Sequence, residues 1–184
     1  MSKINFSARF VITPKINAPI DEVDIPYVGA CELYKYQLVS MISASKNINY
    51  IEAEKIWRQK SLKFDEEMYK YLMLLKNKTK TGLRILLNRN PTLAIGSIFF
   101  LRIGEIKKDY SDLTLSISNN LLVSLAGDFD GDVLNVVPIF DEDMKKTFEI
   151  LSPVNLIISN NDGKFNKKLS LDKDQIIGIH ILNH

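Results

Sequence analysis

The chain has 184 residues, of which 46% are hydrophobic and 25% are charged, and this composition suits one domain that can bury a real core. The 24 basic and 22 acidic residues leave a net charge of +2, so bulk charge does not indicate a nucleic-acid-binding protein. The single cysteine excludes internal disulfides and cysteine-cluster zinc sites, and the two histidines, at 180 and 184, form no ligand pattern.

The sequence also argues against a membrane protein. Residues 1–5 lead into no apolar segment of the kind that forms a signal peptide. No apolar run approaches the length needed to span a bilayer. We therefore expect a soluble, intracellular protein.

The first part of the chain predicts a strand, a connection and a helix. Residues 5–14 are rich in aromatic and β-branched side chains and end at a proline, which favours a strand. Prolines at both ends and within the following stretch predict a loop or an edge segment over residues 15–26. The apolar positions from 28 to 43 are compatible with a short helix.

The clearest helical signal lies in residues 49–60 and 64–77. The second of these segments has acidic residues in its first turn, and its apolar residues share one helix face: Phe64, Met68, Tyr71, Leu72 and Leu75. We expect a helical hairpin, inserted at about residues 47–80 and ended by Gly82. Its apolar stripe is typical of core packing.

Short apolar segments dominate the second half of the chain. They predict strands at residues 83–88, 97–103, 113–117, 121–125 and 133–140, with polar turns between them. Short strands interrupted by a helical hairpin predict an α+β fold, mainly β, built as a small closed or Greek-key barrel. We expect the barrel to occupy residues 1–140.

A helical segment is expected after the barrel, over residues 141–184. Asp141 can cap a helix that runs through Met144 and Phe148 before Pro153. A last helix is predicted to begin at Ser170 or Asp172, and it is apolar almost all round, so it needs a partner surface.

Three carboxylates gather within five residues at Asp128, Asp130 and Asp132, separated only by Phe129 and Gly131. In a strand the three carboxylates would point to one face, and the glycine would let the backbone turn so that they converge. Like charges repel unless a cation offsets them, and Mg²⁺ prefers oxygen ligands in near-octahedral geometry. This pattern favours a Mg²⁺ site.

Two alternatives compete with a Mg²⁺ site. An EF-hand loop counted from Asp128 needs glycine where Val133 stands and glutamate where Ile139 stands, so this calcium motif is excluded. A solvated hairpin turn at Asp130 and Gly131 lies between two apolar runs, as such turns do. The stretch alone therefore leaves the choice between metal site and turn open.

Several stretches, taken in order, resemble the largest (β′-type) subunit of multi-subunit DNA-directed RNA polymerases across its catalytic double-psi β-barrel. Residues 86–93, Leu-Leu-Asn-Arg-Asn-Pro-Thr-Leu, are similar to the family's Asn-Arg-x-Pro-Thr-Leu-His motif. Residues 128–132 match the core of its Asn-Ala-Asp-Phe-Asp-Gly-Asp signature. Residues 6–12 and 20–26 resemble its barrel-opening strands, and residues 159–164 and 174–178 lie where the family has its post-barrel segment.

The resemblance implies a double-psi β-barrel and a role for each matching residue. Asp128, Asp130 and Asp132 would hold the catalytic Mg²⁺, and Arg89 would lie against the ribose of the incoming nucleotide. In two-metal phosphoryl transfer the tightly held ion lowers the pKa of the primer 3′-hydroxyl, while a second ion arrives with the triphosphate. An arginine beside the sugar can hydrogen-bond the 2′-hydroxyl, which distinguishes RNA precursors from DNA precursors.

The sequence departs from the family pattern at three positions. Ala126 replaces the asparagine two places before the first aspartate, and Ala94 replaces the histidine after the Pro-Thr-Leu motif. Val137 replaces a histidine that commonly follows the aspartates. These changes leave the metal ligands intact and affect groups that position the sugar, so we expect a divergent, phage or viral version in the cytoplasm of its host.

The resemblance implies the catalytic-core segment of a DNA-directed RNA polymerase, which holds Mg²⁺ for nucleotidyl transfer from an NTP to the RNA 3′ end. We expect the isolated chain to be inactive and to need the second-largest (β-type) subunit, the remaining β′-type regions, template DNA, product RNA and NTPs. One alternative is the barrel of a single-chain RNA-dependent RNA polymerase, favoured by Gly127. Another is a non-catalytic structural or nucleic-acid-binding barrel, favoured by Ala126 and Ala94.

Overall fold

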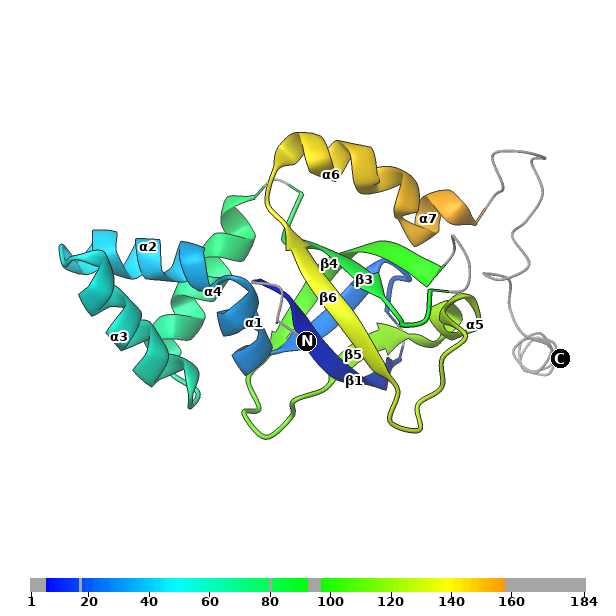
Figure 1. Ribbon diagram of the computed structural model, residues 1–184, viewed down its shortest axis with the longest axis horizontal. Coiled ribbons are helices and arrows are strands. Elements are labelled where there is room, and N and C mark those ends of the chain that lie inside the picture. Colours follow the sequence, from blue (N-terminus) through cyan, green and yellow to red (C-terminus); the bar gives the residue numbers. More distant parts are fainter. Residues whose placement is uncertain (1–5, 17, 80, 93–96, 158–184) are drawn as a thin grey trace, which may run out of the picture.

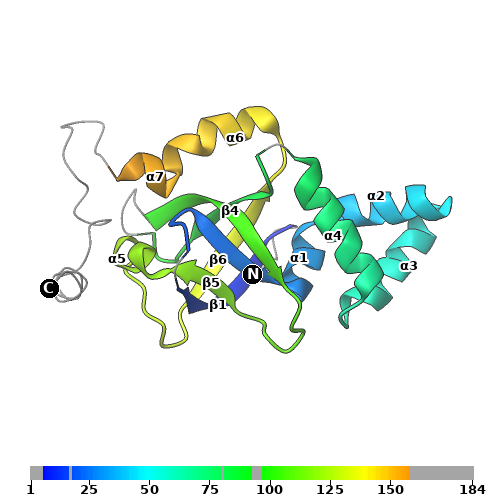
Figure 2. The same ribbon diagram turned by 180° about the vertical axis from the view of Figure 1, so that it is seen from behind.

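The computed structural model describes residues 6–16, 18–79, 81–92 and 97–157. At its centre is a closed barrel with the strand order β1-β5-β2-β4-β3-β6. Figures 1 and 2 show helices α2, α3 and α4 gathered at one end of this barrel and α5 at the other, with α6 and α7 lying along the barrel wall.

The barrel mixes parallel and antiparallel pairs. Strands β1 and β5 are parallel, as are β2 and β4, whereas the four remaining neighbouring pairs are antiparallel. This closed, mixed barrel with helices confirms the predicted α+β fold and agrees with a double-psi β-barrel. The strands are β1 (Ala8–Lys15), β2 (Glu22–Pro26), β3 (Arg84–Asn88), β4 (Ile98–Lys107), β5 (Leu115–Ser118) and β6 (Val133–Ile139).

The barrel interior is filled by every second residue of its strands, because successive strand side chains point to opposite faces. On β3, Ile85 and Leu87 are fully buried, and on β6, Leu134 and Val136 are fully buried. Their neighbours point outward, and this alternation leaves Asn88 and Asn135 partly exposed on the outer surface of the barrel.

Four helices lie between β2 and β3: α1 (Tyr27–Leu33), α2 (Lys35–Lys46), α3 (Tyr50–Ser61) and α4 (Glu66–Lys78). The last two begin where short polar side chains satisfy free backbone N–H groups. The side chain of Asn49 accepts a hydrogen bond from the N–H of Glu52, at 2.9 Å, and that of Asp65 accepts one from Met68, at 2.8 Å. The predicted helical hairpin therefore corresponds to α3 and α4.

Helix α1 joins the helical group to the barrel at close range. A side chain at Gly29 would place its Cβ 2.3 Å from the ring of Phe10 on β1, so only glycine permits this approach. On the other side of α1, the indole N–H of Trp57 donates to the backbone carbonyl of Cys31, at 3.1 Å. Helix α1 thus joins the helical group to the barrel, and hydrogen bonds from α4 to β4 join it at a second place.

Short helical segments complete the fold: η2 (Asn119–Leu121), α5 (Leu122–Leu125), α6 (Glu142–Phe148), η3 (Glu149–Leu151) and α7 (Pro153–Leu156). The predicted cap at Asp141 is confirmed, because its carboxylate accepts a hydrogen bond from the N–H of Met144 at 2.8 Å. In the part of the chain that the structure describes, no helix is both long and apolar enough to cross a membrane.

The prediction of a loop or edge segment over residues 15–26 is wrong for its second half. Residues 22–26 form β2, a strand of the barrel wall that is paired with β5 on one side and β4 on the other. Val23 and Ile25 are fully buried, so the apolar and polar alternation at these positions outweighs the nearby prolines. Pro26 is the last residue of β2 and stands directly before the first residue of α1.

The predicted strand over residues 121–125 is also wrong, because this segment is helical. Leu121 and Leu125 are buried while Val123 is exposed, which is the spacing of one helix face. Two boundaries differ as well. Strand β4 continues to Lys107 through a predicted turn, and α4 ends before Gly82.

Two other expectations, the final helix from Ser170 or Asp172 and the matches at residues 159–164 and 174–178, lie outside the described residues.

Candidate metal centre

The three predicted ligands lie on a loop over residues 126–132 that joins α5 to β6, at the end of the barrel away from α2, α3 and α4 (Figure 1). Ala126 begins this loop in the left-handed conformation, with φ 47°, and Gly131 has φ 114°. The segment is therefore a turn, as the glycine at 131 indicated. It is not a β-hairpin turn, because a helix precedes it.

Contacts at each end fix the aspartate loop to the barrel. The N–H of Gly127 donates to the carbonyl of Leu122 at 3.0 Å, which closes the end of α5. The side chain of Phe129 is partly buried against the core. At the far end, the N–H of Ile12 on β1 donates to the carbonyl of Asp132 at 3.1 Å. The loop thus has a defined path with its polar side chains directed outward.

The three aspartates differ in their surroundings. Asp128 and Asp130 are exposed, whereas Asp132 is half-buried. The carboxylate of Asp128 accepts a hydrogen bond from the N–H of Phe129, at 2.7 Å. Oδ2 of Asp132 accepts one from the N–H of Asp128, at 2.9 Å, so the last aspartate of the motif is tied to the backbone of the first.

Arg89, the predicted ribose-contacting residue, reaches the aspartate loop from the end of β3. Its Nε lies 3.0 Å from Oδ2 of Asp132, and its Nη2 donates to Oδ1 at 3.2 Å. This is the two-pronged geometry in which a guanidinium grips a carboxylate. The N–H of Asp128, and then the Arg89 guanidinium, hold the pKa of the Asp132 carboxyl below its usual range.

The donor set of the aspartate loop fits Mg²⁺ by its chemistry, because three carboxylates supply the hard oxygen ligands that this ion prefers. Apart from its two neighbours in the chain, no described residue has an atom within 4 Å of the position that a Cβ would take at Gly131, so the turn has open space beside it. Among the described residues, however, no three acidic, histidine or cysteine side chains are grouped closely enough to hold a metal ion. In this arrangement Asp132 faces Arg89.

A row of hydrogen-bonded polar side chains on the barrel surface leads to the turn that carries Arg89. The sequence analysis did not predict this row. Arg9 on β1 donates from Nε to Oδ1 of Asn135 on β6, at 2.8 Å, and Nδ2 of Asn135 donates to the carbonyl of Asn88 on β3, at 3.4 Å. Oδ1 of Asn88 accepts from the hydroxyl of Thr92 at 2.9 Å, across the turn that carries Arg89.

Strand register explains why these side chains meet. Asn135 is paired with Arg9 on one side and with Asn88 on the other. The signal available in the sequence was Asn135 itself, a polar residue within the otherwise apolar strand β6. The partners on the neighbouring strands could not be deduced without the register.

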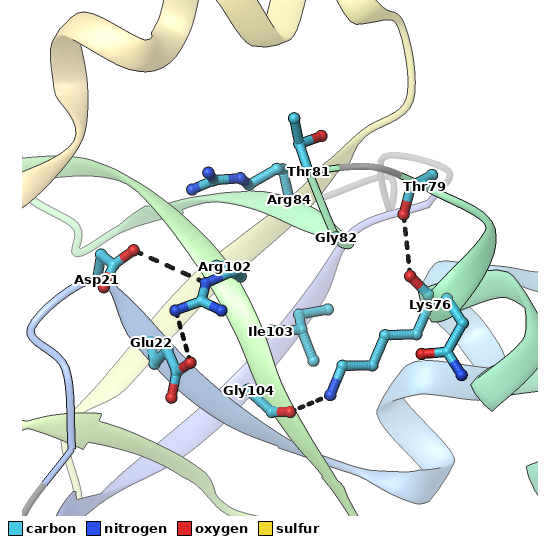
Figure 3. A pocket seen from close by; sticks show the side chains of 11 residues that line it. Asp21, Glu22, Lys76, Thr79, Thr81, Gly82, Arg84, Arg102, Ile103 and Gly104 are labelled. Carbon is cyan, nitrogen blue, oxygen red and sulfur yellow. Dashed lines mark hydrogen bonds and ion pairs between the residues drawn. The ribbon is translucent and has the colours of Figure 1, made fainter.

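A pocket of about 660 Å³ is separate from the aspartate loop. Figure 3 shows Arg102 directed at Glu22, with Nη2 and Oε1 2.7 Å apart, and Lys76 donating to the carbonyl of Gly104. Most of its charges are therefore paired within the chain. Arg84 lies over the ring of Phe100, at 5.3 Å, and its Nε and Nη1 are buried with no hydrogen-bond partner among the described residues.

Comparisons with known proteins agree with this architecture. The model of the family described as RNA polymerase Rpb1, domain 2, matches residues 2–154, a range that contains Arg89 and the whole aspartate loop. The chain is 24% identical over 201 aligned residues to the DNA-directed RNA polymerase III subunit RPC1 of Debaryomyces hansenii. That alignment covers 99% of this chain and spans 13% of the length of the relative.

The family match covers most of the chain and runs across the barrel, the inserted helices and α6. It confirms the resemblance to the largest subunit of multi-subunit RNA polymerases. This chain belongs to the RNA polymerase Rpb1, domain 2 family.

Proposed function

We propose that this chain is the catalytic-core segment of a DNA-directed RNA polymerase, and that Asp128, Asp130 and Asp132 hold the Mg²⁺ used for nucleotidyl transfer. The observation that carries the proposal is the pairing of Arg89 with Asp132. The two motifs lie 43 residues apart in the sequence, yet their charged groups meet at 3.0 Å. A nucleotide-contacting residue and a metal ligand of one active site would have to be neighbours in this way.

The chemistry assigned to each group follows from its charge and place. When bound, Mg²⁺ supplies a Lewis acid that lowers the pKa of the primer 3′-hydroxyl and offsets charge on the phosphates. The aspartates provide the oxygen ligands, and the bond from Ile12 to Asp132 fixes the loop on β1. Arg89 can donate to the ribose hydroxyls of the NTP. The hydrogen bonds from Arg9 to Asn135 and from Asn135 to Asn88 orient the turn that bears Arg89.

The partners follow from the family and are part of the same proposal. The chain corresponds to a small share of its yeast relative, so we propose that it works with the remaining β′-type regions and the second-largest subunit. Template DNA, product RNA and NTPs would complete the assembly, in the cytoplasm. The departures at Ala126, Ala94 and Val137 support a divergent phage or viral enzyme.

RNA synthesis by the reassembled polymerase tests the metal assignment. We predict that Asp130→Ala lowers the synthesis rate by at least about 100-fold, roughly 2.7 kcal/mol of transition-state stabilisation, because it removes one metal ligand. Asp143→Ala is the matched control, since the Asp143 side chain on α6 is 89% exposed and pairs with Lys146. Undiminished synthesis by the Asp130→Ala enzyme would overturn the assignment.

A second candidate function is a non-catalytic, nucleic-acid-binding barrel. Ala126 favours it, because this exposed residue stands where the family places an asparagine that handles the sugar. The same assay separates the two functions, since a non-catalytic barrel would leave RNA synthesis unchanged in every aspartate variant. Replacing the DNA template by RNA in that assay tests the remaining alternative, a single-chain RNA-dependent polymerase.

A further inference from the structure

We propose that Arg89 is a built-in counterion of the aspartate loop, which occupies Asp132 in the absence of a divalent cation and leaves it when a cation binds. The released guanidinium then becomes available to the nucleotide. This inference rests on the proposed function and adds a regulatory step to it, in which cation binding controls the availability of Arg89.

The first argument concerns the oxygen atoms of Asp132. Each carboxylate oxygen offers about two acceptor positions. Oδ2 already accepts from the N–H of Asp128 and from Nε of Arg89, and Oδ1 accepts from Nη2 of Arg89. Both positions of Oδ2 are therefore filled, and Arg89 takes one of the two positions of Oδ1, so a cation competes with Arg89 for every position of Asp132 except one and the position that the N–H of Asp128 fills.

The second argument concerns charge. Asp128 and Asp130 are exposed, and neither has an ion pair within the described residues. Arg89 thus supplies the single positive charge that contacts the aspartate cluster in the part of the chain described here. A divalent cation brings two charges to the same place, so its arrival makes the arginine redundant and repels it.

The third argument concerns the strength of the pair. The side chains of Arg89 and Asp132 are 23% and 22% exposed, so water reaches both groups. Partly exposed ion pairs are weak compared with a multidentate metal site, and they open without leaving a charge buried. The pair is therefore suited to exchange its partner.

Competition of this kind is reciprocal. If a bound cation weakens the grip of Asp132 on Arg89, then Arg89 must weaken cation binding by the same factor. Removal of Arg89 should consequently tighten the binding of a divalent cation. A residue that served only to contact the nucleotide would leave cation binding unchanged in the absence of nucleotide.

Mn²⁺ binding to the full chain, followed by the electron paramagnetic resonance signal of the free ion, tests this inference. We predict that Arg89→Gln lowers the Kd for Mn²⁺ roughly two- to fivefold, the range expected when one competing ion pair is removed. Arg58→Gln is the matched control. It removes an exposed arginine that pairs with Glu54 on α3 and makes no contact with the aspartate loop among the described residues, and it should leave the Kd unchanged.

A second variant and a structural readout keep the test independent of folding. Arg89→Lys retains the charge and loses the two-pronged grip, so its Kd should fall between those of the wild type and Arg89→Gln. In the wild-type chain, the NMR signal of the Arg89 Nε–H should move toward that of a solvated arginine as Mg²⁺ is added.

The outcomes separate this inference from the proposed function. Equal or weaker Mn²⁺ binding by both Arg89 variants, with clear binding by the wild type, would overturn the counterion role and leave the metal assignment standing. An equal gain in the Arg58→Gln chain would reduce the effect to general charge and also overturn it. No Mn²⁺ binding by any of the chains would overturn the counterion role together with the metal assignment.

Discussion

Ala126 adopts a backbone conformation that suits other residues better. Its φ and ψ, 47° and 41°, lie in the left-handed region, where a Cβ is crowded by the backbone. Glycine and asparagine enter this region readily, and the family has asparagine at this position. The chain therefore keeps the turn that leads into the aspartate loop while it has lost the residue best suited to make that turn.

Replacement of Ala126 by glycine should stabilise the protein. We predict a gain of about 0.5–1 kcal/mol in the free energy of unfolding, because relief of the left-handed strain exceeds the added entropy of the unfolded chain. Ala44→Gly, at an exposed position inside α2, should have the opposite sign and cost about 1 kcal/mol. Urea denaturation measures both, and a loss of stability at both positions would contradict the role given to the turn.

The candidate site was only partly predictable at the scale of single residues. Carboxylate spacing showed which chemistry Asp128, Asp130 and Asp132 could perform, because charge and donor type are properties of the residues themselves. The ion pair between Arg89 and Asp132 could not be foreseen, because it depends on how β3 and β6 are placed beside each other in the barrel.

At the scale of elements, local patterns succeeded where one signal dominated. Asn49, Asp65 and Asp141 each cap a helix, and short polar side chains do so through contacts within three residues. The errors arose where two signals conflicted. At 22–26 the prolines obscured a buried strand, and at 121–125 a short apolar run fitted a strand and a helix equally well.

Helices α2, α3 and α4 are joined by a cluster of ion pairs centred on Glu67. Its carboxylate lies 2.8 Å from Nζ of Lys46 and 2.6 Å from Nζ of Lys60, which also contacts Asp65 at 3.0 Å. The hydrogen bond from Lys46, and then the one from Lys60, lower the pKa of Glu67 to about 2. The folded protein therefore keeps this carboxylate charged at a pH that would protonate it in the unfolded chain.

This cluster predicts a pH dependence of stability. A carboxyl group whose pKa is lowered by folding stabilises the protein above its unfolded pKa, about 4.3, and the contribution is lost as the pH falls toward about 2. The Glu67 side chain is 40% exposed, so screening by solvent and salt reduces the effect. Glu67→Gln should flatten the decline in Tm between about pH 5 and pH 2. An unchanged pH profile in thermal unfolding would contradict this account.

At the scale of the whole molecule, closure of the barrel creates the site. Strands β1 and β5 are parallel and lie about 100 residues apart in sequence, as the contact between Thr13 and Thr114 shows with its separation of 101. Long-range pairings of this kind carry no local signal, so the strand order could not be derived from the sequence pattern alone. The family resemblance supplied the barrel type, and the strand order agrees with it.

The barrel brings two distant segments to the aspartate loop. Ile12 on β1 donates to the backbone of Asp132, and Arg89 at the end of β3 grips its carboxylate. A divalent cation held by the loop would therefore lie near both of these segments. This arrangement allows the position of the cation to be mapped through cleavage of the backbone.

Cleavage by hydroxyl radicals from Fe²⁺, bound in place of Mg²⁺, tests the central claim most directly. We predict cuts within residues 126–132, with weaker cuts near Ile12 and Arg89, and their loss in the Asp130→Ala chain and on addition of excess Mg²⁺. The Asp143→Ala chain should give the wild-type pattern, because Asp143 lies on α6 outside the loop. Cuts confined to other segments, or an unchanged pattern in Asp130→Ala, would contradict the claim that this loop holds the ion.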